Sequence, residues 1–226
     1  TASQVGAMST AQVAAIETDD LAAMTATEVA AFSTAAVANL TTDQVGALNT
    51  DQVSALTASQ VKALTTAQVV ALNTDQISQL TTTQVSALSA TQVAAIETDD
   101  LALMTTSAVA AFSTAAVASL TTDQVGVLTS DQVSVLTTAQ VKALTTDQVV
   151  ALSTDQIDKL SATQVGAMNA AQVAAIETDD LALMTATEVA AFSTEQLSAF
   201  SALQAAAFGS TQLAAMSSEQ RAALGL

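Results

Sequence analysis

The sequence predicts an all-α fold, a tandem octapeptide-repeat α-solenoid in which very short helices, one for every eight residues, wind into a superhelix. Three observations predict it. An apolar residue recurs every eight positions without a slip, from Met8 to Leu224. A second apolar residue lies three positions before nearly every one of these, which is helical and not strand spacing. Helix-capping residues return with the same period.

The eight-residue period runs through residues 1–226 as a single continuous array of 28 octads with two residues over. From Thr41 the chain reads TTDQVGAL, NTDQVSAL, TASQVKAL and TTAQVVAL. The apolar residues are spaced by three and five residues in turn, about 4.0 on average, whereas an α-helix has about 3.6 residues per turn. In one continuous helix the line of apolar side chains would therefore drift around the helix axis. Each octad is therefore predicted to be a short helix that stops and restarts.

The first octad position shows how each helix restarts. It is Ser, Thr or Asn in nearly every octad, as at Thr41, and these are preferred N-cap residues. Gln follows three residues later in most octads, as at Gln44, which completes the Ser/Thr-x-x-Gln capping box. The apolar residue before the cap, Leu40, and the one at the fourth helical position, Val45, are placed to form a hydrophobic staple.

Helix length and charge placement follow from the same register. We expect helices of about six or seven residues, too short to persist alone, so stacking has to stabilise them. Asp43 and Asp51 fall in the first turn, whereas Lys62 falls near a helix end, as the helix dipole favours. Of the 21 acidic residues, 20 lie at the first, third or fourth octad position and only Asp158 does not. We expect three or four helices in each superhelical turn.

The octads are themselves grouped into a longer repeat. The segment ETDDLA begins at Glu17 and returns at Glu97 and Glu177, at intervals of ten octads. The array is therefore divided into two full copies, residues 1–80 and 81–160, and a partial third copy, residues 161–226.

Composition excludes several functions. The chain has no Cys and no His, so thiolate metal sites, disulfides and Ser-His-Asp triads are absent. Four Lys and Arg against 21 Asp and Glu leave a net charge of −17, which excludes nucleic acid as a partner. No apolar stretch of about 18 residues exists, so no membrane span is predicted. We expect no enzyme, no catalytic residues, no cofactor-binding residues and no metal ligands.

Four features invite a functional interpretation beside a structural one. The acidic cluster of Glu17, Asp19 and Asp20, with its two copies, could hold Ca²⁺, but placement at a helix N-terminus is the favoured interpretation. Paired threonines such as Thr41 and Thr42 could form an ordered hydroxyl array of the ice-binding kind, but capping and solubility explain them. The glutamines at the fourth octad position could form a ladder of amide groups inside the solenoid, although capping alone accounts for them. The aromatic series in three successive octads is interpreted as core in preference to a contact patch; it consists of Phe192, Phe200 and Phe208.

Two resemblances accompany these residues. The octads LTTDQVGAL and LTTAQVVAL resemble repeats of very large, acidic, Cys-poor bacterial secreted proteins of the adhesin or haem-utilisation kind, which implies an extracellular or cell-surface location. Each octad is also locally similar to the first helix of transcription activator-like effector repeats, which opens Leu-Thr-x-x-Gln-Val. The second helix and base-reading loop of that family have no counterpart in this sequence, and we interpret the likeness as convergent capping chemistry.

Two hypotheses about function follow. The first is a non-enzymatic structural region of a large bacterial secreted or surface protein, acting as spacer, stalk or adhesion scaffold. The second is a binding module whose regular surface recognises a protein, a glycan, Ca²⁺ or ice. Neither end of the sequence shows the polar capping repeat that exposed solenoid termini normally need. We therefore expect the array to continue in a longer protein, or its ends to associate with one another.

Overall fold

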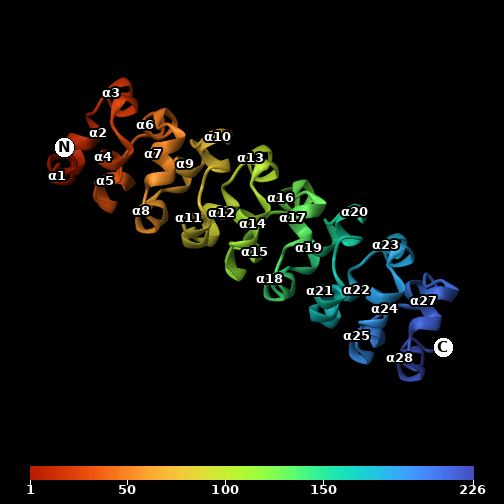
Figure 1. Ribbon diagram of the computed structural model, residues 1–226. Coiled ribbons are helices and arrows are strands. Elements are labelled where there is room, and N and C mark those ends of the chain that lie inside the picture. Colours follow the sequence, from red (N-terminus) through yellow and green to blue (C-terminus); the bar gives the residue numbers. More distant parts are fainter. The chain divides into compact units, whose positions relative to one another are not determined.

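The computed structural model describes all 226 residues and contains helices without any strand. One helix forms in each of the 28 octads (Figure 1), which confirms the all-α, octad-based fold class. The chain divides into two compact units, Thr1–Ser119 and Leu120–Leu226, and each is an α-solenoid described by itself below. No helix is long and apolar enough to cross a lipid bilayer.

The helices of the first unit are α1 (Ala2–Gly6), α2 (Thr10–Ala14), α3 (Thr18–Ala23), α4 (Ala26–Val29), α5 (Thr34–Ala38), α6 (Thr42–Ala47), α7 (Thr50–Ala55), α8 (Ala58–Ala63), α9 (Thr66–Val70), α10 (Thr74–Ser78), α11 (Thr82–Ala87), α12 (Ala90–Ala94), α13 (Thr98–Leu103), α14 (Thr106–Ala110) and α15 (Thr114–Ser119). Those of the second unit are α16 (Thr122–Val127), α17 (Ser130–Ser134), α18 (Thr138–Ala143), α19 (Thr146–Val150), α20 (Thr154–Ile157), α21 (Ala162–Ala167), α22 (Ala170–Ala174), α23 (Thr178–Leu183), α24 (Ala186–Ala190), α25 (Thr194–Ser198), α26 (Ala202–Ala205), α27 (Ser210–Ala215) and α28 (Ser218–Ala223).

Many helices are shorter than the sequence predicted. Their lengths run from four residues, as in α4, to six, as in α6, so the shortest predicted length is the longest one observed. The reason lies in the junction, where the N-cap residue is extended, with φ −71° and ψ 161° at Thr41. In α6 the closing apolar residue, Leu48, is extended as well, with φ −60° and ψ 137°. The extended residues on both sides thus limit a helix to six residues. In the shorter α4 the C-cap Ala30 keeps helical angles, with φ −63° and ψ −18°, but the Ala31 N–H donates to the Glu28 carbonyl only three residues back, so the last turn tightens and leaves the α-helix.

Capping boxes form as the sequence predicts. In α6 the Thr41 backbone N–H donates to Gln44 Oε1 over 2.9 Å, and the Gln44 N–H donates to Thr41 Oγ1 over 3.1 Å. Where the fourth position is Ala, as at Ala36, only the hydroxyl half survives, and the Ala36 N–H donates to Ser33 Oγ over 3.1 Å. The cap thus satisfies backbone donors that so short a helix would otherwise leave open.

Stacking follows one rule inside each unit: every helix packs against the helix three places further along. In the first unit α1 packs on α4, α3 on α6 and α12 on α15. In the second unit α16 packs on α19 and α24 on α27. The inward-facing fifth and eighth octad positions form the core, where Val45 and Leu48 are 0% and 3% exposed.

The fourth-position glutamines join successive turns. Gln84 in α11 is 2% exposed, and its Nε2 donates to the carbonyl oxygens of Val53 over 2.8 Å and Leu56 over 2.7 Å, at the end of α7. Its Oε1 accepts from the Thr81 N–H over 2.8 Å, so one amide caps the start of its own helix and the end of the helix four octads earlier. We call this arrangement the amide clasp.

The amide clasp recurs with one acceptor 28 residues before the donor and a second acceptor 31 residues before it, or 30 residues before it, as at Gln60 and Gln204. In the second unit Gln172 donates to the carbonyl oxygens of Val141 and Leu144 over 2.8 and 2.7 Å. Because each helix packs on its third predecessor and clasps its fourth, a superhelical turn holds between three and four helices, a number that the sequence pattern did not determine. The sequence interpretation that capping alone accounts for the fourth-position glutamines was incomplete, because the same amide also reaches across the turn.

Replacing Gln84 by Glu tests the clasp. The carboxylate still accepts the Thr81 N–H, as Glu28 accepts that of Thr25, but it has no N–H to donate to the buried carbonyls. We expect Gln84→Glu to lower the free energy of unfolding by about 1–3 kcal/mol, measured by urea denaturation followed by circular dichroism. Gln12→Glu is the matched control, because Gln12 makes the cap but no clasp. Equal losses in both variants would contradict the role of the clasp.

Helices three apart approach closely at the sixth octad position. A Cβ on Gly166 would lie 3.2 Å from the Ala191 carbonyl oxygen, and one on Gly46 would lie 3.3 Å from that of Ala71. At Gly126 the corresponding distance is 3.7 Å, an ordinary contact. The approach is therefore tight at some turns and relaxed at others.

Two helical glycines of the second unit give a matched pair of alanine substitutions. Gly126→Ala should raise the free energy of unfolding by about 0.5–1 kcal/mol, because alanine loses less backbone entropy in a helix. Gly166→Ala gains the same propensity but has to displace the Ala191 backbone, so we expect little gain or a loss. Thermal and urea unfolding measure the change in stability of both variants. Equal stabilisation by the two substitutions would contradict the close approach of Gly166 to the Ala191 carbonyl.

Candidate functional site

The acidic clusters lie at helix N-termini. Glu17 is the N-cap of α3, and Asp19 and Asp20 lie in its first turn, with the same arrangement repeated in α13 and α23. This placement confirms the favoured sequence interpretation. No three acidic side chains in the chain come close enough together to hold a metal ion.

One acidic residue has a partner that the sequence did not indicate. Asp100, in the first turn of α13, is only 5% exposed and accepts a 2.6 Å hydrogen bond from Thr74 Oγ1 in α10. Asp100 occupies the octad position of a clasp glutamine, and the carboxylate can accept from a hydroxyl but cannot donate to a carbonyl. This acidic octad thus replaces the amide clasp with a different contact between helices three apart. Only the stacking step of three octads places these two residues together, so no local sequence signal could have revealed the pair.

The threonine columns divide into two roles. First-position hydroxyls are occupied by capping, as where Thr41 Oγ1 accepts the Gln44 N–H over 3.1 Å. Several second-position threonines are exposed, and they include Thr42, Thr82 and Thr122. Only alternate hydroxyls of such pairs therefore face solvent without a capping role.

The three successive phenylalanines of the second unit pack against one another. The Phe192 and Phe200 ring centroids lie 5.4 Å apart in an edge-to-face arrangement, and those of Phe200 and Phe208 lie 5.6 Å apart. Phe192 and Phe208 are 1% and 5% exposed, whereas Phe200 is half-buried. The predicted assignment to the core is confirmed for Phe192 and Phe208, whereas Phe200 lies at the edge of the core, and such ring pairs add about 0.5–1.5 kcal/mol each beyond area burial.

A cavity of about 360 Å³ opens on the second unit. Lys142 of α18 and Glu195 of α25 contribute one charge of each sign, and Asn169 and Ser193 contribute N-cap groups. Gly166 also lines the cavity. No local sequence signal singled out this group of residues, because they come from four octads that stacking alone brings together.

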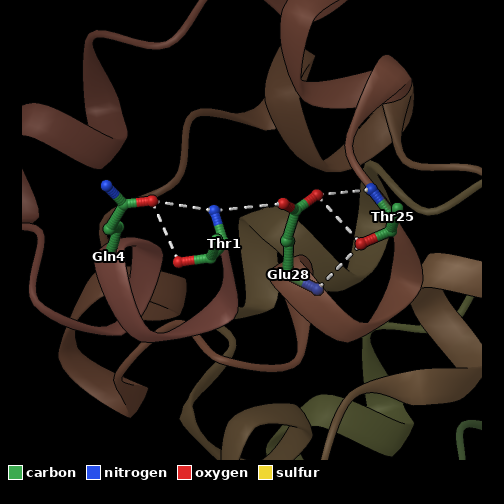
Figure 2. A network of polar contacts seen from close by, with 4 residues as sticks. All are labelled: Thr1, Gln4, Thr25 and Glu28. Atoms are coloured by element: carbon green, nitrogen blue, oxygen red, sulfur yellow. Dashed lines mark hydrogen bonds and ion pairs between the residues drawn. The ribbon is translucent and has the colours of Figure 1, made fainter.

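An ion pair joins two helices at the start of the chain. The Thr1 amino group lies 3.5 Å from Glu28 Oε1 and donates to Gln4 Oε1 over 3.1 Å (Figure 2). Glu28 Oε2 accepts the Thr25 N–H over 3.0 Å and the Thr25 hydroxyl over 2.9 Å. These hydrogen bonds from Thr25, followed by the nearby amino group, lower the pKa of Glu28 below its ordinary value.

We expect Glu28 to titrate at a lower pH in the folded chain than in the urea-unfolded chain, as followed by ¹³C NMR of its carboxyl carbon. Because folding lowers this pKa, the contribution of Glu28 to stability is complete above its unfolded pKa and is lost as the pH falls through the folded pKa. Thr25→Ala removes the hydroxyl donor and should raise the folded pKa toward the ordinary glutamate value. Identical titration in folded and unfolded chains would contradict the network in Figure 2.

Two hydroxyl–carboxylate pairs are the side-chain groups most like a catalytic pair, and in each the hydroxyl already donates to the carboxylate. Of the two hydroxyl–carboxylate pairs, Thr25 with Glu28 caps α4 within one octad, and Thr74 with Asp100 joins α10 to α13. A nucleophile of the serine type needs a base that is itself held by a third group. The side chains at both pairs form contacts of a structural kind.

A family model described as ALTTAQ repeat matches the chain five times, over residues 13–50, 59–90, 93–130, 128–162 and 173–210. These matches together cover well over half of the chain. No curated protein matches it. The match concerns the repeat tract itself.

Proposed function

The chain belongs to the ALTTAQ repeat family and is a structural repeat region; from this premise we propose that it acts, without enzymatic activity, as a spacer, stalk or adhesion scaffold in a large bacterial secreted or cell-surface protein. The observation that carries the proposal is the amide clasp, which repeats the same buried contact from turn to turn within each unit.

A spacer requires a contact that can be repeated without limit. The clasp meets this requirement, because in both units its donor reaches one carbonyl 28 residues earlier and a second one 30 or 31 residues earlier. A typical added octad buries a Val and a Leu and satisfies its own polar groups, and no buried side-chain nitrogen or oxygen lacks a partner. In such arrays stability grows with the number of neighbouring contacts, and length can change without redesign of the fold.

The exposed surface also suits a scaffold. A net charge of −17 makes chains repel one another in dilute solution. The acidic residues are distributed along the helix N-termini and do not gather into one site. The extracellular or cell-surface location is supported by the resemblance of the octads to repeats of large acidic bacterial secreted proteins.

Small-angle scattering tests the spacer role, because a spacer has to hold its ends apart. A compact domain of this length has a radius of gyration of about 17 Å, and an unfolded chain one of about 52 Å. We expect a value clearly between these two in a chain whose circular dichroism is helical, after extrapolation to zero concentration. A radius at the compact limit, or one at the unfolded limit with loss of the helical signal, would refute the proposal.

A further inference from the structure

The cavity of the second unit lies between two amide clasps. On one side Gln172 of α22 donates to the Lys142 carbonyl oxygen over 3.3 Å and holds the start of α22 against the end of α18. On the other side Gln196 of α25 donates to the Met168 carbonyl oxygen over 2.6 Å, at the end of α21. The chain passes directly from Met168 to Asn169, and this junction of α21 and α22 lines the cavity between the two clasps.

Two opposite charges line the cavity without pairing with one another. The Lys142 side chain comes from α18 and that of Glu195 from α25, and both residues are exposed. The ion pairs of the chain form elsewhere, at Glu28 and at Lys159. The ammonium group and the carboxylate at the cavity are therefore both available to a ligand.

Two further groups at the cavity have hydrogens left to donate. Asn169 Oδ1 accepts a backbone N–H of α22 over 3.0 Å, which leaves its Nδ2 group as a donor. Ser193 Oγ accepts a backbone N–H of α25 over 3.1 Å, which leaves its hydroxyl hydrogen. Asn169 lies on the side of Lys142, at the start of the helix that clasps it, and Ser193 lies two residues before Glu195. One side of the cavity thus suits an anionic group, and the other suits a cationic one.

The separation of the two charges indicates the length of a ligand. Helix α18 packs on α21 and is clasped by α22, which packs on α25, so Lys142 and Glu195 belong to helices two steps apart. Each step between packed helix axes is about 8–10 Å. A single α-amino acid carries its ammonium and carboxylate groups on one carbon atom and is too short to reach both charges. An extended peptide gains about 3.3–3.6 Å per residue, so about three residues cover about 10 Å between their termini.

The size and lining of the cavity agree with such a ligand. Its volume of about 360 Å³ falls within the range of about 300–1,000 Å³ that is typical of small-molecule sites. Met168, Ala167 and Ala170 add apolar groups to the lining. These short or buried side chains suit a peptide with small side chains, such as those of alanine.

The equivalent place in the first unit has only one of the two charges. Ten octads earlier, Lys62 stands where the second unit has Lys142, and its carbonyl oxygen accepts the Nε2 group of Gln92 over 3.4 Å in the corresponding clasp. The position of Glu195 is occupied there by Ala115. The first unit therefore supplies an internal control that keeps the lysine and the clasp but lacks the acid.

We propose that the cavity binds short peptides of about three residues whose two termini are free. Lys142 and the Nδ2 group of Asn169 bind the C-terminal carboxylate, and Glu195 binds the N-terminal ammonium group. The Ser193 hydroxyl donates to a carbonyl oxygen of the peptide. Because the two charges differ in sign, they fix the direction in which the peptide lies. This binding site is additional to the spacer role and does not rest on it.

A titration followed by ¹H–¹⁵N NMR of the 226-residue chain tests the proposal, with tri-alanine as the probe. We expect saturable shift changes that are confined to Lys142, residues 166–170 and residues 193–196. Tri-alanine that is acetylated and amidated keeps the body of the peptide but loses both terminal charges, so it should give no saturable change. Absence of saturation with tri-alanine, or equal binding of the blocked peptide, would overturn the proposal.

Charge-matched variants identify the residues. Lys142→Gln and Glu195→Gln each remove one charge at an exposed position, and we expect each to raise the dissociation constant of tri-alanine about fivefold, as for the loss of a favourable exposed ion pair. Lys62→Gln and Glu219→Gln make the same two changes at the same octad positions away from the cavity and should bind like the parent chain.

Equal weakening in the cavity variants and in their controls would show that net charge attracts the peptide, and would overturn the proposal. Unchanged binding in Lys142→Gln and Glu195→Gln would overturn it as well. Circular dichroism of each variant checks that the helices are intact.

Discussion

The amide of the fourth-position glutamine is the interaction on which the rest of the structure depends. A helix of so few residues leaves most of its backbone groups without intrahelical partners, and it cannot persist alone. The glutamine supplies what is missing at both ends: its Oε1 accepts at the start of its own helix, and its Nε2 donates at the end of the helix four octads earlier. Lys, Glu or Asp at this position could supply one of these functions but not both, because only an amide is donor and acceptor in one planar group.

The array varies this interaction in a regular way. Glu28 keeps the cap through its carboxylate, Ala36 keeps only the hydroxyl half of it, and Asp100 exchanges the clasp for a hydrogen bond with Thr74. These departures occur in the segments that begin with ETDDLA, once in every ten octads. Apolar burial, about 1.5–3 kcal/mol for each Val or Leu, continues through these segments and maintains the stacking where the clasp is absent.

The engagement of most polar side chains with one another bears on function. Most of the hydroxyls and amides at the first and fourth octad positions are engaged in caps and clasps, and the ETDDLA acids stand at helix N-termini. Such a surface favours a structural role, and membership of the ALTTAQ repeat family fits that role.

The sequence by itself determined the helical class, the octad register, the capping boxes and the identity of the core positions, because caps and apolar spacing act within one octad. It could not determine the helix ends, since the extended residues that turn the chain depend on how the next helix packs, and many helices proved shorter than the pattern indicated. It placed the ETDDLA acids at helix starts correctly, yet the pairing of Asp100 with Thr74 and the mixed-charge cavity around Lys142 could not be read from it. Those features join residues from octads three or more apart. Only the tertiary structure decided that the glutamine amide reaches 31 and 28 residues back, because that distance is set by the number of helices in a superhelical turn and not by any local preference of the chain.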